Sequence, residues 1–187
     1  PHEAALVLAR RVVSAVAAML LTCIWVRVRN PTCRSVSEGQ LRDLATMLLG
    51  FSCLWAYLWY CQYMLIWYTN QQHETGYYVV RTGDGWHLLF YATVVLKWAL
   101  PFVLLLGKAG KRRLAVLALA AFSALVGHWL DLYVMIFPDV AKDRVWPGLL
   151  ETGMALGLGA ACAWVLRNSD PLEDRTMAGV DRRISDP

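Results

Sequence analysis

Long apolar segments separated by short polar connections dominate this chain. Five of them approach the roughly 20 apolar residues that a helix needs to cross a bilayer. They cover residues 4–26, 44–68, 88–106, 114–137 and 149–166. The apolar residues are continuous rather than alternating, which favours helices over strands, and a helix satisfies its own backbone hydrogen bonds in lipid. We therefore predict an all-α integral membrane protein, with about five transmembrane helices forming a four-helix bundle plus one over residues 1–168 and a polar tail over 169–187.

Composition and charge agree with a multi-pass membrane protein. Hydrophobic residues make up 58% of the 187 residues and charged residues 17%, a balance outside that of ordinary soluble domains. Basic residues gather in three segments that share one side of a five-span topology, namely Arg27, Arg29, Arg34 and Arg42; Lys108, Lys111, Arg112 and Arg113; and Arg167, Arg175, Arg182 and Arg183. The positive-inside rule makes that side, with the tail, cytoplasmic. Loops 69–86 and 138–147 then face outward, and Arg10 and Arg11 near the first helix count with that side. The net charge of +4 requires no nucleic acid.

Three ionisable residues lie inside apolar spans. Lys97 is in the third span, and His128 and Asp131 are in the fourth. A charge in hydrocarbon costs at least ~2.5 kcal/mol, so such groups normally face a partner, water or a pathway. His128 and Asp131 share a helix face through their i, i+3 spacing, and Asp131 is positioned to pair with Lys97. Two interpretations stay open: a structural ion pair between two helices, or an outward proton pathway or quinol-side proton acceptor.

Three further polar residues are weaker candidates for the same cluster. Tyr60 and Tyr63 lie in the second span, and Glu151 begins the fifth. Counted along their helices from the outer ends, Glu151 is about 3–5 Å deep and the two tyrosines about 8–12 Å deep, so all three fall in the outer half of the membrane. They complete the predicted polar cluster or proton pathway.

The motifs that would hold a cofactor are missing from this sequence. The cysteines, Cys23, Cys33, Cys53, Cys61 and Cys162, form no C-x-x-C, C-x-x-C-H or ferredoxin-type run. A c-type haem or an iron–sulfur cluster held by this chain alone is therefore not expected. No nucleotide, zinc-protease or hydrolase motif occurs, and we predict no metal site and no catalytic residue.

Two local signals bear on helix geometry. Pro101 removes the hydrogen bond that the carbonyl of Lys97 would accept, which predicts a tolerated kink in the third span. Ser37 and Gln40 have the spacing of a capping box, which predicts that the second helix begins there.

Three strings resemble a known family. They are FSCLWAYLWYCQYMLIWYTNQQHET (51–75), KWALPFVLLL (97–106) and GHWLDLYVMIFP (127–138). They resemble the second NrfD-like membrane subunit, the quinone-binding subunit 2, of alternative complex III. That complex is a bacterial quinol:cytochrome c oxidoreductase. The family usually reads N-I-P-E-E-T in the outer loop, where this chain has an altered motif carrying Asn70, His73 and Glu74. The resemblance implies that this chain is the C-terminal half of an NrfD-like fold, and we expect further residues N-terminal to Pro1.

The resemblance also implies a role. The chain would be an accessory subunit of the bacterial inner membrane, without its own redox metal. Its partners would be a paralogous NrfD-like subunit, an iron–sulfur subunit and c-type cytochrome subunits, which would hold the haem c and the iron–sulfur clusters. Quinol is a candidate ligand. Asp131 and His128 would serve a proton role, modulated by Lys97 and with Glu151 near the exit. The alternatives are a purely structural subunit and half of a secondary transporter, although Pro101 is the only mid-helix break of the kind that transporters use.

Overall fold

The computed structural model describes residues 2–29, 37–69, 75–76, 79, 86–107, 110–140, 152–154, 156–157, 159–164 and 167–168. Every regular element in these ranges is helical. Four helices are long and apolar enough to cross a membrane, namely Ala4–Arg29, Glu38–Thr69, Trp86–Leu106 and Leu114–Phe137. The predicted all-α membrane fold is confirmed.

The fifth predicted span falls in a separate compact unit of residues 146–187. It corresponds to a shorter apolar helix, Thr152–Trp164. The rest of the description concerns residues 1–145, which form the other unit.

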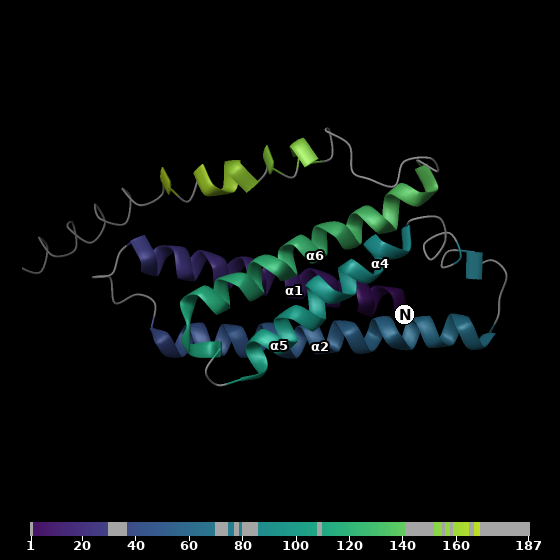
Figure 1. Ribbon diagram of the computed structural model, residues 1–187, viewed down its shortest axis with the longest axis horizontal. Coiled ribbons are helices and arrows are strands. Elements are labelled where there is room, and N and C mark those ends of the chain that lie inside the picture. The colour runs from purple at the N-terminus through teal and green to yellow at the C-terminus, as the bar shows by residue number, and fades with distance from the viewer. Residues whose placement is uncertain are drawn as a thin grey trace, which may run out of the picture. The chain divides into compact units, whose positions relative to one another are not determined.

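The first two helices form an antiparallel pair. α1 spans His2–Arg29 and α2 spans Glu38–Thr69, and they lie side by side along most of their length (Figure 1). The capping box is confirmed at the start of α2. The Ser37 N–H donates to the Gln40 side chain over 2.9 Å, and the Gln40 N–H donates to Ser37 Oγ over 3.2 Å. These reciprocal bonds satisfy donors that a helix start leaves without partners.

The third span is one helix with an irregular centre. α4 (Trp86–Val94) continues into a π-helical turn, η1 (Val95–Ala99), and then into α5 (Leu100–Leu106). The N–H of Leu100 bonds to the carbonyl of Val95, five residues back. Pro101 lacks the N–H that would complete an α-helical bond to Lys97. The interruption expected at Pro101 therefore takes the form of a π-turn directly before it.

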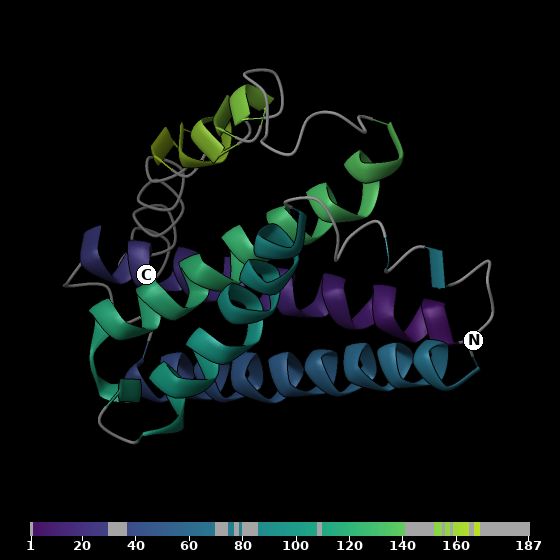
Figure 2. The same cartoon turned by 45° about the vertical axis from the view of Figure 1, so that its right-hand side comes forward.

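A tight connection leads to the last long helix. It includes η2 (Gly110–Arg112), and α6 then spans Leu114–Val140. A Cβ at Gly110 would collide with the Leu104 carbonyl oxygen, so this turn requires glycine. α6 contacts α1 on one side and α4, η1 and α5 on the other (Figure 2).

Two apolar clusters form the core. The larger one runs through α1, α2, α5 and α6 and contains alanine and leucine, which allow close helix packing. The smaller one is aromatic and joins α4 to α6 through Trp86, Phe90 and Tyr133, with Trp59 and Tyr63 of α2 packed against it. The charged residues in the next section lie where these helices meet.

Candidate functional site

An ion pair links the third span to α6 inside the bundle. Lys97 Nζ donates to Asp131 Oδ2 over 2.6 Å. The Lys97 side chain is 0% exposed and that of Asp131 is 11% exposed. Because a buried charge without a partner is strongly unfavourable, each of these residues depends on the other. The pairing predicted from the sequence is confirmed.

Arg10 is a third member of this cluster, which the sequence analysis does not include in the site. Its side chain lies inside the bundle, and Arg10 is only 9% exposed. Its Nε lies 3.3 Å from Asp131 Oδ2, and its Nη1 donates to Met135 Sδ over 3.1 Å. α1 begins at His2, so Arg10 lies about 12 Å along the helix from its N-terminal end. Arg11 faces outward.

Trp55 of α2 completes the surroundings of the lysine. Lys97 Nζ lies 4.4 Å from the centre of the Trp55 ring, and Trp55 is fully buried. A cation over an indole face gains attraction from the ring quadrupole, more so away from water. Lys97 is thus held between a carboxylate on α6 and an aromatic ring on α2.

Gly127 brings α6 close to the π-turn. A Cβ at Gly127 would lie 2.8 Å from the backbone N of Lys97 and 3.0 Å from its Cβ. Real Cβ atoms do not approach that closely, so only glycine allows the two backbones to meet here. Asp131 lies one helical turn beyond Gly127 and therefore faces the same neighbour. The close contact sets the short Lys97–Asp131 distance.

His128 lies beside the ion pair on α6 and is half-buried. Its Nδ1 is buried and has no hydrogen-bond partner within the part of the chain that the structure describes. Most buried polar atoms have such a partner. Two basic side chains, Arg10 and Lys97, share the single carboxylate of Asp131. The site therefore combines a locked carboxylate, surplus positive charge and a buried imidazole nitrogen that is free to form a hydrogen bond.

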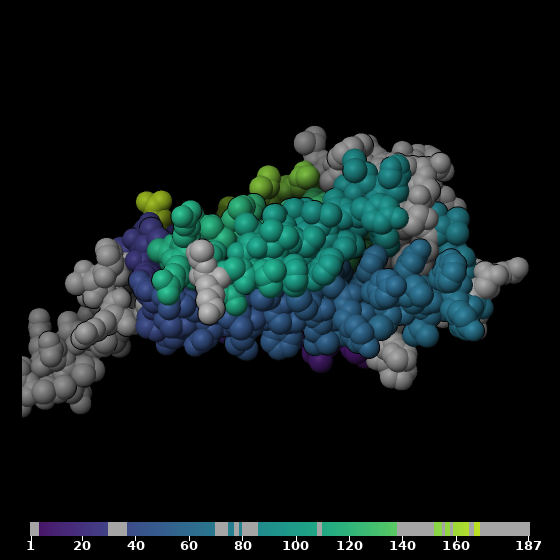
Figure 3. Space-filling model, turned by 60° about the horizontal axis from the view of Figure 1, so that its bottom comes forward, coloured from purple at the N-terminus to yellow at the C-terminus, as the bar shows by residue number. Residues whose placement is uncertain are grey.

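The two tyrosines proposed from the sequence lie among aromatic neighbours. Tyr63 stacks on Trp59 with ring centres 6.1 Å apart, and Trp59 stacks on Trp55 at 6.3 Å. A ladder of aromatic rings thus connects Tyr63 to the lysine. Tyr60 is 55% exposed and lines an apolar groove of about 350 Å³ between α2 and the third span, with Trp98 on the opposite wall. These two segments lie side by side on the face shown in Figure 3.

Four of the proposed residues lie outside the described residues, and they are Asn70, His73, Glu74 and Glu151. Among the residues that are described, no group of three or more His, Cys, Asp or Glu side chains is placed to hold a metal ion. Arg10, Trp55 and Gly127 were missed by the sequence analysis. The signal for Gly127 was available, since a small residue one turn before a buried aspartate favours close helix contact.

Comparison with known proteins adds no assignment. No family model matches this chain, and no curated protein matches it.

Proposed function

We propose that this chain is an integral membrane subunit of a bacterial quinol:cytochrome c oxidoreductase of the alternative complex III type. It would anchor the redox subunits and contribute a polar site on the quinol side of the membrane. One observation carries the proposal. The three strings that resemble the family supply Trp55, Lys97 and Asp131, and these side chains meet at one point inside the bundle. Segments far apart in the sequence thus contribute to a single cluster.

Within this proposal the charged residues have different roles. Asp131 is held by both Lys97 and Arg10, so it acts as a fixed negative charge rather than as a proton carrier. His128 has a buried ring nitrogen with no partner among the described residues. We assign to His128 the hydrogen bond to a quinol hydroxyl group, and to the ion cluster the joining of α1, the third span and α6 around it. This combines the two interpretations that the sequence left open.

Depth supports a site reached from the outer side. The end of the bundle that holds the start of α2 and the end of α5 is basic, through Arg42, Lys111 and Arg112. The positive-inside rule makes that end cytoplasmic. Counted from the opposite ends of the membrane spans, at Trp86 and Phe137, Lys97 lies about 16 Å and Asp131 about 9 Å along their helices. In a hydrocarbon core about 30 Å thick, these depths extend from the outer half to the midplane.

The experiment is purification through a tag on this chain in mild detergent, followed by a reduced-minus-oxidised visible spectrum. A c-type haem band is expected, because haem-bearing partners should copurify. His128→Ala should then lower quinol oxidation several-fold while the haem content stays unchanged. His87→Ala is the matched control, since His87 is exposed on α4. A colourless preparation without partners would overturn the proposal.

A second candidate function is half of a secondary transporter. The observation that favours it is the π-turn at Lys97, because π-turns are frequent at functional sites and transporters interrupt spanning helices where they bind substrate. The purification separates the two candidates. A transporter should be obtained without haem, and its uptake activity in vesicles should depend on Lys97 and Asp131.

A further inference from the structure

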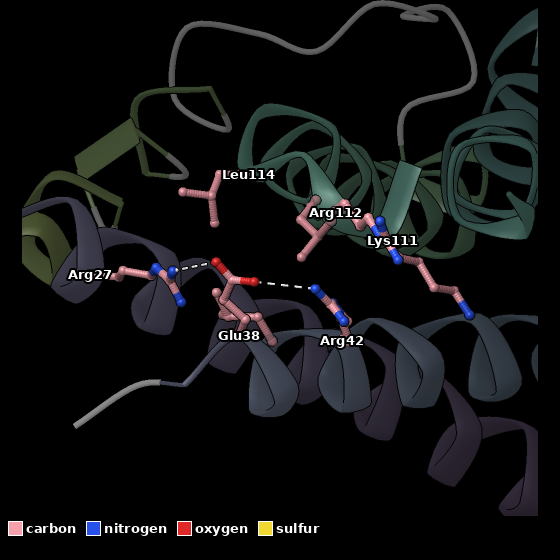
Figure 4. A pocket seen from close by; sticks show the side chains of 8 residues that line it. Arg27, Glu38, Arg42, Lys111, Arg112 and Leu114 are labelled. Atoms are coloured by element: carbon pink, nitrogen blue, oxygen red, sulfur yellow. Dashed lines mark hydrogen bonds and ion pairs between the residues drawn. The ribbon is translucent and has the colours of Figure 1, made fainter. Parts of the chain in front are cut away.

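A small basic pocket lies at the end of the bundle opposite the aromatic cluster. It has a volume of about 120 Å³ and lies between α1, α2, η2 and α6. Four cationic side chains, Arg27, Arg42, Lys111 and Arg112, line it together with one carboxylate, Glu38, which lies between Arg27 and Arg42 (Figure 4). None of these residues takes part in the Lys97–Asp131 cluster, and the proposed function uses their charge only to orient the bundle in the membrane.

The positive charge of this pocket is only partly balanced. Glu38 accepts hydrogen bonds from Arg27 over 3.0 Å and from Arg42 over 3.2 Å. Lys111 Nζ donates to the Thr46 hydroxyl over 3.1 Å, which leaves its charge without a counterion there. Arg112 is exposed and has no ion pair with any residue that the structure describes. The surplus charge fits an anion with several acceptor oxygens, because guanidinium and ammonium groups bind phosphate through charge-assisted hydrogen bonds.

The other side of the pocket is apolar. Leu41 and Leu117 are each 2% exposed, and Leu114 is 37% exposed at the start of α6. The pocket lies at the ends of membrane-spanning helices, which is the level of lipid headgroups. A ligand here therefore meets cationic groups at its head and the accessible side chain of Leu114 beside them, while Leu41 and Leu117 close the floor of the pocket. A free anion would use only the first of these two features.

We propose that this pocket binds the phosphate headgroup of an anionic phospholipid, with the start of its acyl chains against Leu114. Basic pockets between transmembrane helices recognise anionic headgroups in this way. Arg112 and Lys111 supply the charge that Glu38 does not neutralise. Arg27 and Arg42, already anchored by Glu38, hold the opposite wall in position.

The test is a titration of the purified full chain in detergent with dioleoylphosphatidylglycerol, followed by native mass spectrometry. Dioleoylphosphatidylcholine and sn-glycerol 3-phosphate are titrated in parallel. Saturable binding of phosphatidylglycerol alone is expected. The double variant Lys111→Gln/Arg112→Gln should weaken this binding roughly 10- to 30-fold, since each basic residue near an anionic lipid raises the affinity about five-fold.

Arg113→Gln is the matched control for the single variant Arg112→Gln. Both arginines are exposed and adjacent, but only Arg112 lines the pocket. Arg112→Gln should weaken phosphatidylglycerol binding and Arg113→Gln should not, with helix content checked by circular dichroism. Equal losses would show a diffuse charge effect and overturn the proposal. Equally tight binding of glycerol 3-phosphate, or no saturable binding of phosphatidylglycerol, would overturn it as well.

Discussion

Asp131→Asn should be among the most destabilising conservative changes in this chain. The substitution keeps the size of the side chain but removes the only carboxylate that contacts Lys97 and Arg10 within the described residues. Both cations then remain in the bundle interior, where Lys97 is 0% exposed and Arg10 is 9% exposed. Neither can reach water without opening the contacts of α6 with α1 and with the π-turn.

The magnitude follows from how the charges are shared. Removing one partner of a buried ion pair costs about 3–5 kcal/mol, because an uncompensated charge remains. Asp131→Asn leaves two such charges, so we expect the upper part of that range. Lys97→Met leaves Asp131 paired with Arg10 at 3.3 Å, so it should cost less than half as much. The double variant Lys97→Met/Asp131→Asn should lose less free energy of unfolding than the sum of the losses in the two single variants.

The assay is reversible unfolding in mixed micelles of dodecylmaltoside and sodium dodecyl sulfate, followed by far-ultraviolet circular dichroism. Asp43→Asn is the control, since Asp43 is exposed on the same bundle, and it should stay within about 0.5 kcal/mol of the parent chain. If Asp131→Asn lowers the free energy of unfolding by under 1 kcal/mol, or if Lys97→Met costs as much as Asp131→Asn, the charge-sharing argument is wrong.

Two other predictions use the same unfolding measurement. Gly127→Ala should destabilise by about 1–3 kcal/mol, as overpacked core positions do, because the new methyl group would lie 2.8 Å from the backbone N of Lys97. The control is Gly50→Ala, which has open space around it and should be neutral or stabilising. A neutral Gly127→Ala would contradict the close packing. Trp55→Ala should cost about 3–5 kcal/mol through loss of a fully buried ring. Trp67→Ala, at a 69% exposed position, should cost under 1 kcal/mol, and similar losses at both positions would refute the role of Trp55 beneath the lysine.

The sequence was sufficient for the membrane helices and for one ion pair. Continuous apolar runs of helix length have few alternatives in lipid, so the element type was well determined. Lys97 and Asp131 were the opposite charges in adjacent spans, which made their pairing the least costly arrangement. The capping box at Ser37 was also a local signal, because its donors and acceptors lie within one helical turn.

The rest of the site depended on tertiary contacts. The predicted span 4–26 includes Arg10 but does not identify a partner for it, so its contact with Asp131 depended on the position of α6. Trp55 is one of many aromatics in α2, and its face toward Lys97 cannot be read from a helix that is apolar all round. The segment 88–106 is also apolar on all sides, so its sequence has no hydrophobic periodicity from which the π-turn could be predicted.

The wide turn at η1 affects which residues of the whole third span face α6. Trp86 and Phe90 are buried near the start of this span, and five further buried positions recur at an interval of four residues, at Leu89, Thr93, Lys97, Pro101 and Leu105. An ideal α-helix turns about 100° per residue, so each step of four overshoots by about 40°. Over the full stretch the drift would approach about 160°, and Leu105 would lie almost opposite Leu89. Underwinding at η1 absorbs part of this drift, so that one continuous stripe follows α6 from end to end, with the lysine at its centre.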